Sequence, residues 1–267
     1  MSIQLDQRIV ERFPFDLKTG SRLVVAAYMG SISHNTYVPK SDPDAIDDVE
    51  ILGSVLPPAD RLIGLDAWEH WTLQFEELDV TVFFSLSKLV RLWLKSSPNV
   101  LGLLWLRSEH YLHRSQAFEA FVAIRDAFVS KQAHAPFIGY VMAQLADIHK
   151  NRYEGYMGTK RKELVERFGY DVKSAAHLIR LLRMGTEYLR DDILNVYRTD
   201  DAEELRAIKR GEWSLEQVQV QAAHLFALAD DLAERSRLPE QPDRALINRT
   251  LVAVTADWLR TAEPVHS

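Results

Sequence analysis

The fold is decided by the stretch at residues 48–55, which reads DVEILGSV. Its apolar and β-branched residues are typical of a buried strand, and Pro57-Pro58 closes it. Asp48 and Glu50 are two residues apart, and on a strand side chains with that spacing point to the same face. Two unpaired carboxylates are costly to bury, so this face is not ordinary core. We therefore predict a functional acidic pair on this strand.

A third acid lies in the best strand of the chain, residues 78–84, which read LDVTVFF. Asp79 is out of place among these apolar residues for the same reason of burial cost. If the two strands are neighbours in a sheet, Asp79 converges with Asp48 and Glu50. Such a cluster suits Mg²⁺, which binds carboxylates together with substrate phosphates. Two such ions about 4 Å apart stabilise the attacking and leaving oxygens of an in-line phosphoryl displacement.

A glycine-serine pair, Gly30-Ser31, follows directly after another predicted strand at residues 21–28. Glycine lets backbone N–H groups approach a phosphate, and the serine hydroxyl adds a donor. The pair by itself is a weak signal. Upstream of an acidic strand it predicts that a triphosphate lies between these donors and the metal.

After the strands, the chain has the pattern of helices. Ser85 has the character of an N-cap for a helix at 86–95. Further helices are predicted at 116–132, 136–149, 160–168, 172–189, 201–210, 214–236 and 242–261. A strand-rich front half before a helical back half is an α+β pattern. We expect a catalytic core with a small mixed sheet and helices at 1–114, and a largely α-helical region at 115–267 that closes the active-site cleft.

Composition narrows the function. A net charge of −6 and a pI near 5.9 weigh against a broad nucleic-acid-binding surface, but they allow local contacts to phosphates. The absence of cysteine excludes disulfides, thiolate zinc sites and cysteine nucleophiles. The start lacks the apolar segment of a signal peptide, and no stretch approaches the roughly 18 apolar residues of a membrane span. We expect a cytoplasmic protein without a membrane partner; its oligomeric state is not predicted.

This pattern resembles the bacterial and phage predicted nucleotidyltransferases of the DNA polymerase β-like superfamily. The superfamily pattern is Gly-Ser, then Asp-x-Asp/Glu on a strand, then an acid on a later strand. Here Gly30-Ser31, Asp48-x-Glu50 and Asp79 follow it. The resemblance spans roughly residues 20–250, and its further motifs are Thr36, Gly53 with Pro57-Pro58, SLSK at 85–88, PNVL at 98–101, LLW at 103–105, KSAAHLIRLL at 173–182 and GEWSL at 211–215.

The resemblance implies a metal-dependent nucleotidyltransferase. Such an enzyme moves NMP from an NTP, ATP among them, to an acceptor hydroxyl and releases pyrophosphate. Asp48 and Glu50 would hold two Mg²⁺ or Mn²⁺ ions, and Asp79 would complete the second metal site. Gly30 and Ser31 would bind the β- and γ-phosphates. RNA or tRNA, a protein and a small molecule all stay open as the acceptor.

Four basic or imidazole side chains are second candidates for nucleotide binding. Lys173, His177 and Arg180 follow i, i+4 and i+7, so they form a stripe on one helix face. Lys88 is the basic residue of the 86–95 helix that lies nearest to the acidic strand. The ordinary alternatives are a solvated helix face for Lys88 and a hydrogen-bonded interhelical histidine for His177.

The loop before the acidic strand is longer than usual and contains a second acidic pair, Asp42 and Asp44. By spacing alone this pair also qualifies for the metal. Pro43 has no backbone N–H to donate to a sheet ladder, whereas Val49 belongs in one. This favours the pair Asp48 and Glu50. The choice between the pairs remains open at this point.

Two functions of other classes compete with the transferase. A catalytically inactive nucleotide-binding or adaptor protein on the same fold would need an incomplete acidic set. A metal-dependent phosphohydrolase would need histidines interleaved with the acids, and none flank Asp48 or Asp79.

Overall fold

The computed structural model describes residues 20–39, 41–65, 67–73, 80–139, 141, 145 and 159–261. Within them, five strands form one mixed sheet in the order β3-β4-β2-β1-β5. The strands are β1 (Arg22–Tyr28), β2 (Glu50–Leu56), β3 (His70–Leu73), β4 (Val80–Ser85) and β5 (Tyr111–Arg114). The predictions of β1, β2 and β4 are confirmed as strands, but β2 begins at Glu50, so Asp48 precedes the strand on which it was predicted to lie. β5 was not predicted. It pairs antiparallel with β1 at the sheet edge.

The two strands that carry the acids in the sequence are neighbours. β2 and β4 pair in parallel, with Glu50 opposite Val80, and β1 runs antiparallel to β2 on its other side. The strands are therefore neighbours, which is the condition under which the sequence predicted that the acids converge. Asp79 itself lies outside the described residues.

Side chains of β2 alternate between the two faces of the sheet, as on any strand. Leu52 and Leu56 belong to the main core under the helices, while Ile51 and Val55 pack with Phe83 in a smaller cluster on the other face. Glu50 shares the helix-covered face with Leu52 because they are two residues apart. The acidic pair therefore faces the helical half of the molecule.

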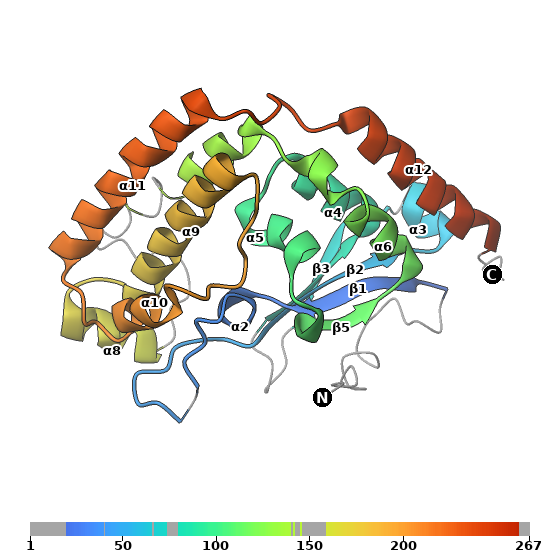
Figure 1. The fold of residues 1–267 in the computed structure, drawn as a ribbon. Helices are drawn as coiled ribbons and strands as arrows, with labels where there is room; N and C mark the ends of the chain where they lie inside the picture. Colours follow the sequence, from blue (N-terminus) through green and yellow to red (C-terminus); the bar gives the residue numbers. More distant parts are fainter. Residues whose placement is uncertain are drawn as a thin grey trace.

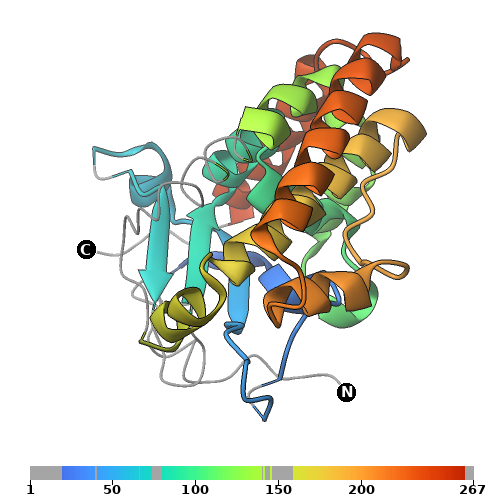
Figure 2. The same cartoon turned by 90° about the vertical axis from the view of Figure 1, so that its left-hand side faces the viewer.

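Helices lie over this face of the sheet (Figures 1 and 2). Ser85 is the N-cap of the first long one, and its hydroxyl accepts from the Lys88 backbone N–H, as predicted. The helices before residue 130 are α2 (Gly30–Ser33), α3 (Ala59–Ile63), α4 (Leu86–Leu94), α5 (Pro98–Leu101) and α6 (Gln116–Val122), with the 3₁₀ turns η2 (Gly102–Trp105), η3 (Ser108–His110) and η4 (Arg125–Phe128). After them come η5 (Lys131–Ala133), α8 (Thr159–Phe168), α9 (Val172–Asp191), α10 (Ala202–Lys209), α11 (Leu215–Arg235) and α12 (Arg244–Thr261).

The predicted single helix at 116–132 is wrong, because the chain breaks after α6 into η4 and η5. The cause is the packing of rings around the fully buried Trp93. The ring centroids of Phe118 and Phe128 lie 6.3 and 5.7 Å from that of Trp93. A continuous helix would separate these two phenylalanines by about 15 Å along its axis, too far for both to contact one indole.

The long helices connect the two halves of the chain. α9 runs beside α11 and also contacts α8 and α10 (Figure 1). α12 returns to pack on α4 and α6, and its Trp258 indole N–H donates to the Pro57 carbonyl oxygen at 2.7 Å. The architecture is α+β, as predicted. Among the helices of the described residues, none combines the length and apolarity that a bilayer span requires.

Candidate active site

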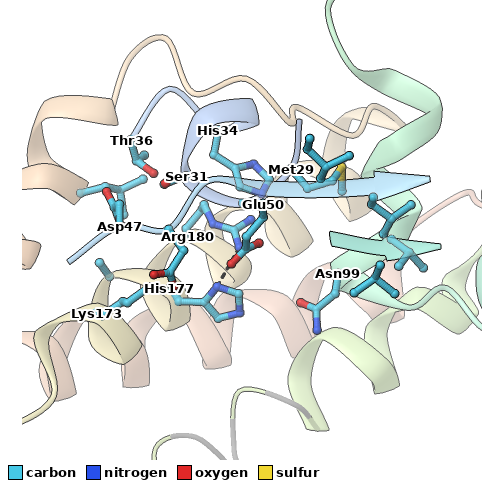
Figure 3. A pocket seen from close by; sticks show the side chains of 18 of the residues that line it. Met29, Ser31, His34, Thr36, Asp47, Glu50, Asn99, Lys173, His177 and Arg180 are labelled. Carbon is cyan, nitrogen blue, oxygen red and sulfur yellow. Dashed lines mark hydrogen bonds and ion pairs between the residues drawn. The ribbon is translucent and has the colours of Figure 1, made fainter. Parts of the chain in front are cut away.

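A cavity of about 420 Å³ lies between the sheet and the helices, with walls from α2, β2, β4, α5, α9 and α10. Figure 3 shows labelled side chains from these elements turned toward one another around it. The site residues predicted from sequence that line it are Gly30, Ser31, Asp48, Glu50, Lys173, His177 and Arg180. The structure thus brings together segments that are up to 150 residues apart, from Gly30 to Arg180 (180 − 30).

Gly30 lies directly against the acidic strand. The Met29 backbone N–H donates to the Glu50 carbonyl oxygen at 2.9 Å, at the point where β1 and β2 end their pairing. A Cβ atom at Gly30 would lie 2.6 Å from the Glu50 carboxylate oxygen Oε2, and Gly30 has a φ of +61°. Both the close approach and the left-handed backbone favour glycine at this position.

The two carboxylates have different surroundings. Burial raises the pKa of Glu50, and the nearby Lys173 ammonium only partly opposes this. Asp48 is paired, since Lys173 Nζ lies 2.5 Å from Asp48 Oδ2 and also donates to the Ile46 carbonyl oxygen. The Asp48 side chain remains 41% exposed, so the pair is accessible to an incoming cation.

Asp48 and Glu50 fit a Mg²⁺ or Mn²⁺ ion. Both are hard oxygen donors at an open cavity, Glu50 as the first residue of β2 and Asp48 two residues before it. Mg²⁺ is commonly held by one or two carboxylates plus substrate phosphates. Burial raises the pKa of Glu50 because desolvation disfavours its charged form, and a cation bound beside it would stabilise that form. Within the described part of the chain, which leaves out Asp79, no three acidic or imidazole groups form a metal-binding cluster.

His177 and Arg180 form a connected pair on α9. Arg180 Nη2 donates to His177 Nδ1 at 2.9 Å (dashed in Figure 3). Because a guanidinium only donates, Nδ1 is the acceptor and the neutral imidazole carries its proton on Nε2. Burial, followed by the charge of Arg180, lowers the pKa of His177 well below its usual value. His177 is therefore a neutral donor beside a largely buried guanidinium.

Three other sequence candidates lie elsewhere. Lys88 Nζ pairs with the exposed Glu69 carboxylate at 3.0 Å, and Lys88 does not line the cavity. Asp42 and Asp44 do not line it either; they face Arg210 at 3.6 Å and Arg167 at 3.1 Å. Of the two acidic pairs that the sequence left open, Asp48 and Glu50 are the pair at the cavity.

Asp47 and Lys209 also line the cavity and were not singled out from sequence. Lys209 Nζ lies 2.8 Å from each Asp47 carboxylate oxygen and donates to the Thr36 carbonyl oxygen at 2.7 Å. Asp47 in turn accepts from the Val38 backbone N–H at 2.7 Å. Burial lowers the pKa of Lys209, against the opposing charge of Asp47. This buried ion pair joins the residue before Asp48 to the end of α10.

The loop after α2 is also tied to the helical half. His34 Nδ1 lies 2.8 Å from the Val196 carbonyl oxygen and donates to it. The Asn35 amide donates to the Arg198 carbonyl oxygen, and Arg206 donates to that of Asn35. The His34 ring is buried in this contact. The helical half thus holds the loop that leads into the acidic strand.

Comparison with known proteins gives one family match. The family model described as RlaP, RNA repair pathway DNA polymerase beta family, matches residues 18–253, which include every residue that lines the cavity. A nucleotidyltransferase-like protein from Exiguobacterium sibiricum aligns over 96% of this chain and 72% of its own, with 11% identity and a TM-score of 0.29. The Bradyrhizobium diazoefficiens CD-NTase CdnG in complex with GTP aligns over 93% and 89%, with 13% identity and a TM-score of 0.22. No curated protein matches the chain.

The Asp47–Lys209 pair is expected to be important for stability. Lys209→Met leaves the Asp47 carboxylate buried without its cation, so it should lower the free energy of unfolding by about 3–5 kcal/mol in urea titrations. Adding Asp47→Asn should recover part of the loss, because the amide oxygen still accepts from Val38. Lys131→Met is the control: its partner Glu240 is 79% exposed, and the loss should stay below about 1 kcal/mol. Equal losses in the two lysine variants would contradict the assignment.

Glu50 is expected to reduce stability at neutral pH. A carboxyl whose pKa rises on folding contributes stability below its unfolded pKa and loses it as pH rises through the folded pKa. Glu50→Gln should therefore raise the Tm at pH 7, and the gain should shrink as the pH is lowered through the raised pKa. The control is Glu69→Gln, since hydrogen bonding to Lys88 lowers the pKa of Glu69 and no gain is expected. Calorimetric scans across pH measure both, and a Tm of Glu50→Gln below that of the wild type at pH 7 would refute this assignment.

Proposed function

Because the chain belongs to the RlaP family, the RNA repair pathway DNA polymerase beta family, we propose that it is a metal-dependent nucleotidyltransferase. The observation that carries the proposal is a single cavity that brings Gly30-Ser31 and Asp48-x-Glu50 together with Lys173, His177 and Arg180 of α9. In the proposed reaction the oxygen of an acceptor hydroxyl attacks the α-phosphorus of an NTP. The bond from that phosphorus to the bridging oxygen breaks, pyrophosphate leaves, and the hydroxyl proton passes to a carboxylate.

The residues around the cavity have separate roles in the proposed reaction. Gly30 allows the phosphates to approach the backbone, and the Ser31 hydroxyl is a donor to them. Lys173 and Arg180 neutralise phosphate charge from α9, and His177 adds a neutral donor. Asp48 and Glu50 would hold Mg²⁺ or Mn²⁺, which when bound supplies charge neutralisation at the attacking and leaving oxygens. Asp79, outside the described residues, remains the expected third acid.

The proposed acceptor is an RNA hydroxyl. The family's description refers to RNA repair, which favours RNA over the protein and small-molecule acceptors. The net charge of −6 is consistent with a local contact to an RNA end rather than a long groove around a duplex.

A second candidate is a nucleotide-binding protein on the same fold that does not catalyse transfer. It is favoured by the ion pair between Asp48 and Lys173, because an ammonium at 2.5 Å competes with a metal ion for that carboxylate. This candidate predicts binding of triphosphates without release of pyrophosphate.

The transferase is tested by incubating the protein with α-³²P-labelled NTPs, Mg²⁺ or Mn²⁺, and RNA oligonucleotides with defined ends. Label should move to the RNA with release of pyrophosphate. Asp48→Asn and Glu50→Gln should each lower the rate at least about a hundredfold, because charge stabilisation of the transition state is lost. Asp42→Asn is the matched control from the acidic pair outside the cavity and should keep the rate.

The outcomes separate the candidates. Transfer by the wild type that survives Asp48→Asn would contradict the assigned acidic pair, and loss in Asp42→Asn would move the site to the loop. Binding of NTP without transfer to any acceptor would favour the non-catalytic protein.

The two lysines near the acidic strands are expected to differ in triphosphate binding. Lys173→Gln should weaken NTP binding about tenfold, the size of one charge-assisted contact, in calorimetric titrations with Mg²⁺. Lys88→Gln should leave the affinity unchanged, since Lys88 pairs with Glu69 away from the cavity. The reverse order would indicate that the triphosphate lies along α4 instead.

A further inference from the structure

The cavity floor changes character along the sheet. It starts at the charged pair Asp48 and Glu50 and continues along β2 to Leu52, which lies opposite Val82 of β4. Phe84 follows two residues further on β4, and a two-residue step on a strand is about 6.6 Å. The floor therefore passes from carboxylates to apolar side chains over the length of a small ligand.

The side walls follow the same change. In Figure 3 the labelled Thr36, Asp47 and Lys173 lie at one end, and Met29 and Asn99 lie at the other. Val100 of α5 and Met29 add to the apolar surface at that second end. Among the described residues that line it, Asn99 supplies the polar side chain there.

Asn99 is held in place by its backbone while its amide is available to a ligand. It is the second residue of α5, after Pro98, and the Trp93 indole N–H anchors the helix by donating to the Val100 carbonyl oxygen at 3.0 Å. Its side chain is exposed at the cavity and makes no hydrogen bond to any residue that the structure describes. An amide offers both donors and an acceptor in one plane, which suits the edge of a nucleobase.

We propose that the apolar end of the cavity is the nucleoside subsite and that Asn99 selects the base by hydrogen bonding to its edge. This inference rests on the proposed function, since the charged end then takes the triphosphate. Phe84 supplies an aromatic ring next to the base, and Val82, Val100 and Met29 exclude water around it. Exclusion of water increases selectivity, because a mismatched base leaves the amide unpaired. Asn99 is a specificity residue in this scheme and takes no part in bond making.

The test measures equilibrium binding of the α,β-methylene analogues of ATP, GTP, CTP and UTP, with Mg²⁺, to the full chain by calorimetry. The wild type should prefer one base. Asn99→Ala should reduce that preference about tenfold, the value of one neutral hydrogen bond, and Asn99→Asp should change which base is preferred because it replaces donors with an acceptor. Asn195→Ala is the control: Asn195 is exposed, pairs with Glu187 and does not line the cavity, so the preference should stay as in the wild type.

Each result bears on the inference. Equal affinity of the wild type for the four analogues would overturn it, and so would an unchanged preference in Asn99→Ala and Asn99→Asp. In both cases the proposed function stands, because triphosphates still bind. Failure of the wild type to bind any of the four analogues would overturn the inference and the proposed function together.

Discussion

Negative charge at the start of β2 must be balanced, and the helical half supplies the cations that balance it. Asp47, Asp48 and Glu50 enter the cavity from three of four successive positions, where burial makes an uncompensated carboxylate expensive. Lys209 of α10 neutralises the first and Lys173 of α9 the second. Glu50 is left with a raised pKa. The site thus exists only where sheet and helices meet.

This balance also explains how the loop before β2 is held. His34 donates to the Val196 carbonyl oxygen, and Arg206 of α10 donates to the Asn35 carbonyl oxygen. Val38 donates to the Asp47 carboxylate, which is paired with Lys209 at the end of α10. Hydrogen bonds to backbone groups depend little on side-chain identity. The position of the acidic strand thus depends on Lys209, which lies 173 positions after the Thr36 that it contacts.

A gradient from charge to apolar surface follows from the same arrangement. β2 begins with Glu50 at the cavity and continues into Leu52 and Leu56 of the core, so one strand face is functional at one end and structural at the other. α5 covers the apolar end with one exposed amide, Asn99. A triphosphate with an attached nucleoside has the same polarity along its length, which is the physical basis of the proposed mode of binding.

The sequence by itself determined the strands β1, β2 and β4, the Ser85 cap, most of the long helices and the acidic and glycine-serine motifs, because each depends on local spacing and backbone preference. Helical periodicity also placed Lys173, His177 and Arg180 on one face. Only the tertiary structure decided that Lys88 lies outside the cavity, that residues 116–132 break around Trp93, and that Lys209 and Asn99 line the site. These features depend on which surfaces pack together across the chain, and a local pattern carries no information on distances between remote segments.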